Sequence, residues 1–240
     1  MKQKSYAKQF SALFCVLVLL ILINISFGSV SIPFHEILDI LLGGNSSKSS
    51  WDLIILHFRL PKAITAVLVG SGLAIAGLLM QTLFRNPLAG PFVLGISSGA
   101  SLGVAILLLG SGIFGGVLAT IAFSSWGLAI ASSIGAALVL LAVLVTATRV
   151  RNTMSILIIG LMFGTVTAAI ISILTFFSDA EKIQQFVFWG FGSLGNLSWN
   201  EVLIFFIIYL IAVLNLFQII KPLNAFLLGE NYSKSLGINI

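Results

Sequence analysis

The alternation of polar and apolar segments divides this chain into six long apolar runs separated by short polar stretches. None of the six runs contains Asp, Glu, Lys, Arg or His. A helix of roughly 20 apolar residues crosses the hydrocarbon core of a bilayer. Continuous apolar runs, without strict alternation of polar and apolar residues, favour helices over strands. The pattern therefore predicts six transmembrane helices, over residues 10–27, 63–84, 92–109, 120–147, 154–177 and 202–220.

Composition supports a membrane environment. The chain is 59% hydrophobic and 8% charged, whereas soluble domains carry about 25% charged residues. Backbone polar groups must be paired within the protein when lipid is the solvent, so the long apolar runs are expected to be helices. We predict an all-α membrane protein, a polytopic helix bundle that forms a single domain over residues 1–240. The first run is long for a signal peptide and lacks a clear small-residue cleavage site, so we interpret it as a retained span.

The distribution of basic residues predicts the orientation, because Lys and Arg near span ends favour the cytoplasmic side. With the N-terminus in the cytoplasm, eight basic residues fall inside and four fall outside. The inner residues are Lys2, Lys4, Lys8, Arg85, Arg149, Arg151, Lys221 and Lys234. The outer residues are Lys48, Arg59, Lys62 and Lys182. Six spans return the C-terminus to the cytoplasm, and the net charge of +5 then reflects topology and not nucleic-acid binding.

Small residues recur at four-residue spacing within the predicted spans. Gly95, Gly99 and Gly103 form one ridge, and Gly160 and Gly164 begin another. Helices in lipid associate through close van der Waals contact, which small residues permit. We expect these five glycines to pack helices against each other.

The stretch Gly95–Gly99 matches the G-x-S-x-G pattern of serine hydrolases. A serine nucleophile needs a base and a third group that orients the base. The chain has only His35 and His57, both outside the spans, and no Lys or acid lies within a span. Cys15 is the only cysteine, and no His/Cys cluster suggests a metal site. An intramembrane serine hydrolase is therefore a weak alternative, and we expect neither a metal nor a cofactor.

An ion-coupled secondary transporter or a channel is a stronger alternative. Such carriers usually hold ionisable residues at membrane depth, and the predicted spans have none. If nucleotide hydrolysis drives transport, a partner must supply it, because the chain lacks a G-x-x-x-x-G-K-[ST] phosphate loop.

Three segments resemble one membrane protein family. They are "RLPKAITAVLVGSGLAIAGLLMQTLFRNPLAGPFVLGISSGASLGV" at 59–104, "FWGFGSLGNLSWNEV" at 188–202 and "LNAFLLGENYSKSLGI" at 223–238. In this order they resemble the FecCD-type permeases, the membrane subunits of ABC importers for iron–siderophores, haem and cobalamin. The resemblance implies a transporter subunit and not an enzyme, in a bacterial cytoplasmic membrane. It leaves open which chelate is carried, and we expect an iron–siderophore.

The resemblance also implies partners. A cytoplasmic ABC ATPase dimer would hydrolyse ATP, a second permease subunit would complete the path as a homo- or heterodimer, and an extracytoplasmic binding protein would deliver the chelate. Members of the family have about ten spans. The six predicted here, followed by the start of a cytoplasmic coupling loop at 221–240, imply that the chain is incomplete.

Site residues carried over from the family fall into three groups. Arg59 and Lys62 are expected to dock the binding protein, although anchoring to lipid headgroups would also explain them. The translocation path and its gate are assigned to Asn86, Leu88, Thr153, Gly190, Ser193 and Leu194. Contact with the ATPase is assigned to Leu228, Gly229, Glu230, Lys234, Leu236 and Gly237. Each group has an alternative explanation. The inner turn could be a plain helix-breaking turn, the stretch 186–199 an aromatic belt at the membrane surface, and the tail a solvated amphipathic helix.

Overall fold

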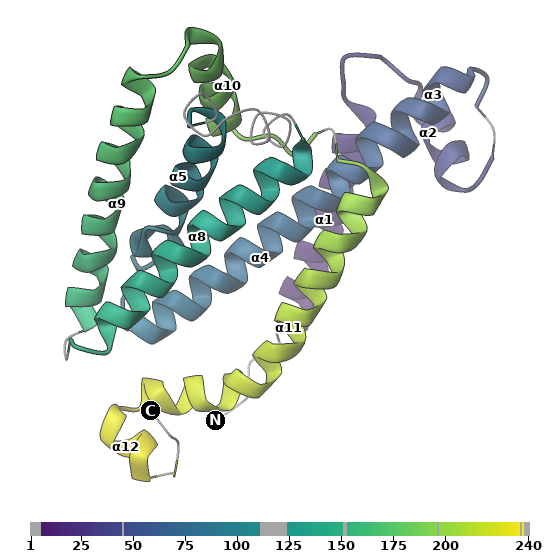
Figure 1. The fold of residues 1–240 in the computed structure, drawn as a ribbon. Helices are drawn as coiled ribbons and strands as arrows, with labels where there is room; N and C mark the ends of the chain where they lie inside the picture. The colour runs from purple at the N-terminus through teal and green to yellow at the C-terminus, as the bar shows by residue number, and fades with distance from the viewer. Residues whose placement is uncertain are drawn as a thin grey trace. The chain divides into compact units, whose positions relative to one another are not determined.

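The computed structural model describes residues 6–44, 46–110, 124–150, 153–195, 197–235 and 237. These residues form helices and connecting turns, and no strand occurs among them (Figure 1). Contacts divide the chain into two compact units. The first joins Met1–Gly72 to Ser193–Phe217, and the second joins Leu73–Gly192 to Gln218–Ile240. Each unit is described separately.

The first unit is built around α1 (Ala7–Ser26) and the N-terminal half of α4 (Leu60–Phe84). Between them lie α2 (Phe34–Leu41), α3 (Ser49–Ile54) and a π-helix, η1 (Ile55–Arg59). The first part of α11 (Trp199–Leu227) also belongs to this unit. Its core consists of the buried residues Ile25, Ile32, Ile37, Ile40, Ile55 and Ala63.

The segment 28–62, expected to be an outer loop before the second span, is largely helical. Helix α3, η1 and α4 form one continuous 36-residue helical stretch, Ser49–Phe84. Asp52, His57 and Arg59 interrupt the apolar pattern of its first turns, and for that reason the sequence predicted a start at residue 63. The helix accommodates Arg59 because its guanidinium is hydrogen-bonded inside the protein.

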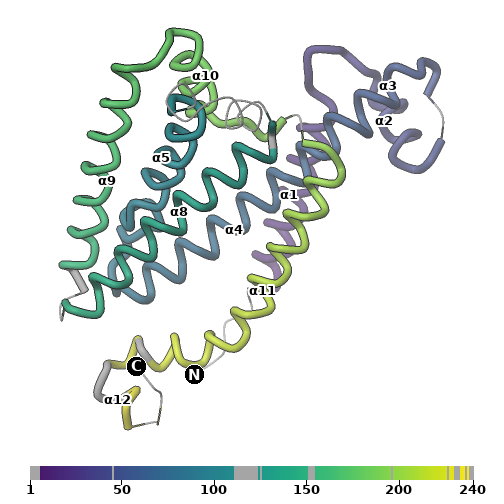
Figure 2. The backbone as a smooth tube through the Cα atoms, in the orientation of Figure 1, coloured from purple at the N-terminus to yellow at the C-terminus, as the bar shows by residue number. Residues whose placement is uncertain are grey.

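In the second unit, contacts join the 3-10 helix η2 (Pro91–Leu94) and the helices α5 (Ile96–Leu108), α8 (Ser125–Ala147), α9 (Thr153–Phe176) and α10 (Ala180–Gly190). The short helix α12 (Glu230–Ser235) also belongs to this unit. Helices α5, α8 and α9 contact one another and run side by side in the tube drawing (Figure 2). One buried cluster, Phe84, Ala89, Leu94, Val139, Val143 and Leu157, joins the inner turn to α8 and α9.

Five helical stretches among the described residues are long and apolar enough to cross a membrane. They are Ala7–Ser26, Ser49–Phe84, Trp126–Ala147, Ser155–Phe176 and Trp199–Ala225. At most 17% of the residues in their most apolar windows are buried within the chain. Most of their surface is therefore left for lipid or for other subunits, as expected of a multi-pass membrane protein.

The remaining predicted span, 92–109, corresponds to η2 followed by the 13-residue helix α5. Gly95 separates the two with a φ of +73°. A sixth span, and the cytoplasmic location of both termini, stay predictions. Residues 120–123 of the predicted fourth span lie outside the described residues.

The last long helix extends beyond its predicted end. Helix α11 continues from residue 220 through Lys221 and Pro222 to Leu227. The predicted span ended at the first charged residue, but a charge does not stop a helix. Proline in a helix interior removes one backbone hydrogen bond and is costly, so Pro222 marks a weak point in α11.

Candidate functional site

Arg59 lies at the end of η1 and is nearly buried, with 8% of its surface exposed. Its Nη1 donates hydrogen bonds to the carbonyl oxygens of Ile25, at 2.7 Å, and Ser26, at 3.0 Å. Its Nη2 donates to the carbonyl oxygen of Val30. The last carbonyls of a helix have no partner within the helix, and a cation near the C-terminus also favours the helix dipole. Arg59 therefore caps the C-terminal end of α1.

Lys62 is placed differently, although it follows Arg59 by only three residues. Its side chain is exposed. Both basic residues line a cleft of about 320 Å³ in the first unit, together with Asn24, Phe27, Gly28, Ser29, Val30, Ile54, Phe58 and Gly195. Of the two cations expected to meet a partner, only Lys62 presents its charge to the surface.

The start of α11 is tied to the same region. The Trp199 indole Nε1 donates a hydrogen bond of 3.0 Å to the carbonyl oxygen of Leu56 in η1. Glu201 forms a local cap by accepting hydrogen bonds from the backbone N–H and hydroxyl of Ser198, at 2.7 and 2.8 Å. The sequence argument did not single out these contacts.

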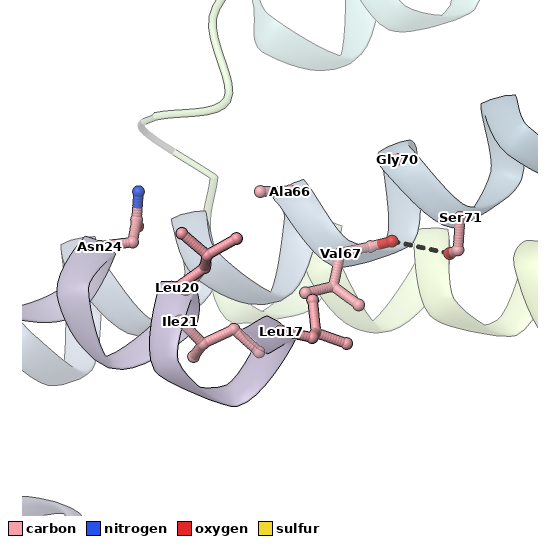
Figure 3. Close-up of a pocket in the computed structure, with 9 residues that line it drawn as sticks. Leu17, Leu20, Ile21, Asn24, Ala66, Val67, Gly70 and Ser71 are labelled. Atoms are coloured by element: carbon pink, nitrogen blue, oxygen red, sulfur yellow. Dashed lines mark hydrogen bonds between the residues drawn. The ribbon is translucent and has the colours of Figure 1, made fainter. Parts of the chain in front are cut away.

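A second hollow of the first unit, an apolar groove of about 450 Å³, separates α1 from α4. Leu17, Leu20 and Ile21 of α1 line one side and Val67 of α4 the other (Figure 3). Ser71 lies at one end, where its hydroxyl donates to the Val67 carbonyl oxygen at 2.6 Å. No charged side chain is among the residues that line the groove.

A carboxylate ties α2 to the segment that leads into α3. Glu36 of α2, 9% exposed, accepts a hydrogen bond of 3.0 Å from the backbone N–H of Ser47 and another from the Ser47 hydroxyl. These two hydrogen bonds lower the pKa of Glu36 below its ordinary value of 4.5. They hold the connection between α2 and α3 closed.

The inner turn between α4 and η2 carries the residues assigned to the cytoplasmic gate. Asn86 Oδ1 accepts a hydrogen bond of 2.9 Å from the backbone N–H of Leu88, which is 87% exposed. Arg85 adopts a left-handed conformation with φ of +46°. These features define a tight turn that presents Leu88 outward. Thr153 begins α9, and its side chain lies outside what the structure describes.

Close helix crossings occur at the glycine ridge. A β-carbon added at Gly99 would lie 2.6 Å from the carbonyl oxygen of Gly135 in α8, and one at Gly103 would collide with the Ala131 carbonyl. The structure thus brings the ridge of α5 against Gly135. The sequence argument missed Gly135, which Ala131 and Val139 flank at the same four-residue spacing.

The second small-residue ridge, on α9, faces the segment before α5. A β-carbon at Gly160 would collide with the carbonyl of Val93, and one at Gly164 would lie 3.3 Å from Ser98 Oγ. At Gly95, a β-carbon would lie 2.9 Å from the Gly160 carbonyl oxygen. The G-x-S-x-G stretch therefore begins a tightly packed helix, and both histidines of the chain lie in other elements, α2 and η1.

The residues assigned to the far end of the path belong to different units, Gly190 to the second and Ser193 and Leu194 to the first. Gly190 is the last residue of α10 and is exposed. Ser193 and Leu194 belong to the first unit, where Ser193 Oγ accepts a hydrogen bond of 3.1 Å from the N–H of Gly195. Leu194 is 37% exposed. The structure describes no polar cluster here that would identify a ligand.

The tail contains the short helix α12, which Gly229 precedes and Gly237 follows, with φ of +121° and +76°. Leu228 and Lys234 are exposed. Ser233, missed in the sequence, is fully buried and donates from its hydroxyl to the Gly229 carbonyl at 2.9 Å. Leu236 lies outside the described residues, as does the side chain of Glu230.

Within the described part of the chain, no three His, Cys, Asp or Glu residues gather in a way that could hold a metal ion. Cys15 is exposed on α1.

Comparisons with known proteins agree on one family. Residues 16–240 match the FecCD transport family. The chain is 37% identical to the "Probable iron chelatin transport system permease protein" of Helicobacter pylori, covering 95% of this chain and 68% of that protein. It is 29% identical to the molybdate import system permease protein of Haemophilus influenzae, and this match covers 100% of this chain and 70% of that protein. A solved structure described as an inward-facing metal-chelate type ABC transporter matches with a TM-score of 0.79 at 27% identity, covering 98% and 69%.

Proposed function

The chain belongs to the FecCD transport family, and from that premise we propose that it carries ferric siderophores across a bacterial cytoplasmic membrane. The family makes it a multi-pass permease subunit of an ABC importer. It is not an enzyme, because a separate ATPase hydrolyses ATP in such importers, and a second permease subunit completes the path. This assignment favours the importer over an ion-coupled carrier, a channel or a serine hydrolase.

One observation carries the choice of substrate. The iron chelatin permease shares 37% identity over 95% of this chain, against 35% over 78% for a vitamin B12 permease, 33% over 95% for a hemin permease and 29% for the molybdate permease. The relatives nevertheless differ in what their names say they import. Ferric siderophore is therefore the substrate to test first, with haem, cobalamin and molybdate as the competing cargoes.

Docking of an extracytoplasmic binding protein is proposed at the cleft beside Lys62. An exposed ammonium on the outer face can attract an acidic partner, speeding encounter and fixing orientation more than it adds affinity. The same cleft contains the loop Phe27–Val30 and Gly195, so a partner there would contact both segments of the first unit. Support comes from the exposure of Lys62 and from the place of the cleft at the outer end of α4.

The translocation path is proposed to pass the inner turn and the segment after α10. At the inner turn, the outward Leu88 and the rigid turn at Asn86 fit a narrow apolar gate, to which Thr153 at the start of α9 is also assigned. At the outer end, the proposed lining is Gly190, Ser193 and Leu194. The glycines at 95, 99, 103, 160 and 164 then act in packing and not in binding cargo.

The ATPase contact is proposed for the tail. Helix α12 is a short element between Gly229 and Gly237, two glycines with positive φ, and the exposed Leu228 precedes it. A short helix bounded in this way can bind a partner as one rigid element. The proposed contact residues are Leu228, Gly229, Glu230, Lys234, Leu236 and Gly237. Cytoplasmic location of this tail requires an even number of spans. We propose η2 and α5 as the sixth, since together they would extend at most about 27 Å against a hydrocarbon core of about 30 Å.

Substrate choice is tested by uptake in a bacterial strain that lacks its own FecCD permeases. The full chain is expressed with its second permease subunit, ATPase and binding protein, and cells are offered ⁵⁵Fe-labelled hydroxamate and catecholate siderophores, haemin, cyanocobalamin and molybdate. We expect energy-dependent accumulation of at least one ferric siderophore, and none of molybdate. Accumulation of haemin, cobalamin or molybdate without any ferric siderophore would overturn the proposed substrate but leave the importer assignment.

A further inference from the structure

We propose that Arg59 is a positioning residue that clasps the loop after α1, and that it shapes the docking cleft without itself meeting the binding protein. The idea rests on the proposed docking at this face. The two basic residues of "RLPK" then have different roles. Arg59 binds backbone carbonyls of its own chain, and the exposed Lys62 attracts the partner.

The inward role follows from how the guanidinium is used. Three of its hydrogen bonds go to backbone carbonyls, those of Ile25, Ser26 and Val30. Only 8% of the side chain is exposed. A planar guanidinium can bind several acceptors at once in a fixed geometry, and here the acceptors span the last turn of α1 and the loop that follows. To pair with a carboxylate of a partner, Arg59 would have to leave these carbonyls unpaired.

Gly28 leaves the space that the Arg59 guanidinium occupies. A β-carbon added there would lie 2.7 Å from Nη2 of Arg59 and 3.0 Å from its Cζ. Contacts under 3.0 Å do not occur for real side chains without displacement of a neighbour. A side chain at residue 28 would therefore force the guanidinium to shift from its place against the carbonyls. Glycine at 28 leaves room for the guanidinium in this position.

The clasp also determines one wall of the cleft. Phe27, Gly28, Ser29 and Val30 line the cleft beside Lys62, and Arg59 fixes both ends of this loop through Ser26 and Val30. Release of the guanidinium would free the Val30 end of this wall, whereas Phe27 would stay bound through its N–H to the Ile23 carbonyl oxygen. A partner that recognises the cleft would then meet a loop of altered shape, although Lys62 would be unchanged.

Hydrogen exchange measured by mass spectrometry on the full chain in lipid nanodiscs tests the clasp. Gly28→Ala keeps both basic residues and introduces one methyl group at the guanidinium. We expect the amides of the last turn of α1, residues 23–27, to exchange on the order of tenfold faster in Gly28→Ala and in Arg59→Gln. Gly195→Ala is the matched control in the same cleft, because its added β-carbon meets only Ser193 Oγ, at 3.5 Å.

The outcomes separate cleanly. Wild-type exchange is expected in Gly195→Ala and in Lys62→Gln. Wild-type exchange in Gly28→Ala would overturn the clasp. Should Arg59→Gln fail to fold, the exchange rates of Gly28→Ala and of the conservative Arg59→Lys still test the clasp. Lys retains the charge but cannot bind three carbonyls in the same geometry, so faster exchange is expected in Arg59→Lys as well.

Binding kinetics connect the clasp to function. With the importer's own binding protein, Lys62→Gln is expected to slow association about two- to fivefold at low salt and to weaken its salt dependence. Gly28→Ala is expected to weaken capture at every salt concentration with the salt dependence retained. Unchanged association in Lys62→Gln would refute docking through Lys62 while the exchange result stands. A weakened salt dependence in Arg59→Gln, with normal capture in Gly28→Ala, would show direct docking by Arg59 and overturn the proposal.

Discussion

Near the C-terminal end of α1, two basic side chains differ in exposure and therefore in what they can bind. Arg59 and Lys62 lie one helical turn apart, yet one is buried against carbonyls and the other is exposed. The motif alone predicts two outward cations. It cannot reveal the buried state of Arg59, because the acceptors at Ile25 and Val30 lie about 30 residues earlier in the chain and become neighbours only on folding.

Glu36 gives a pH-dependent prediction at the same scale. Its pKa is lowered in the folded state by the two hydrogen bonds from Ser47, so the ionised form stabilises the α2–α3 connection. This stabilisation is present above the ordinary pKa of 4.5 and is lost as the pH falls through the lower, folded-state pKa. We expect thermal stability to drop on acidification below about pH 4.5, as followed by the melting temperature of the purified protein.

Two variants check the origin of that effect. Glu36→Gln removes the titrating group, so the melting temperature should be lower at neutral pH and should depend less on pH in the acidic range. Ser47→Ala removes one of the two hydrogen bonds and should give an intermediate result. A Glu36→Gln protein with the full acid sensitivity of the wild type would show that another group is responsible.

At the scale of helices, five of the six predicted spans correspond to long apolar helices. The locations were predictable because lipid imposes length and apolarity on a span. The ends of the helices were not predictable, because a charged residue need not end a helix. Arg59 is buried and hydrogen-bonded within a continuous helical stretch, and α11 continues past Lys221. The division of the predicted span 92–109 into η2 and α5 was not predictable either. The apolar run is continuous in sequence, but the backbone breaks at Gly95, which has a positive φ.

The crossing of α5 and α8 leads to a prediction about packing. A β-carbon at Gly135 would collide with the Gly99 carbonyl and come within 2.9 Å of Gly103, so even Gly135→Ala must push the helices apart. Overpacking of this kind costs about 1–3 kcal/mol. We expect Gly135→Ala to lower the melting temperature and the yield of monodisperse protein in size-exclusion chromatography.

Gly77→Ala is the control for this prediction, since it makes the same change in α4, where an added β-carbon meets no atom within 4 Å. It should match the wild type, or gain slightly because alanine favours the helix. Equal stability of the Gly135→Ala and wild-type proteins would show that the crossing tolerates more separation than its geometry indicates.

At the scale of the whole molecule, the sequence predicted the class of protein better than its sites. Lipid as the solvent follows from the rarity of charge, and the FecCD family follows from three motifs that the family match over residues 16–240 supports. The site residues depend on contacts that no motif encodes, such as Gly28 with Arg59 and Gly135 with Gly99. Residues assigned by resemblance to the path and to the ATPase contact stay predictions.

Energy coupling tests the central claim most directly. The full chain is reconstituted in proteoliposomes with its second permease subunit, ATPase and binding protein, and initial uptake of ⁵⁵Fe-siderophore is measured with ATP. The account predicts that uptake stops when the ATPase carries a substitution of its phosphate-loop lysine, and that it persists when ionophores dissipate the ion gradients. Uptake that continues with the inactive ATPase, or that collapses with ionophores while ATP is present, would contradict it.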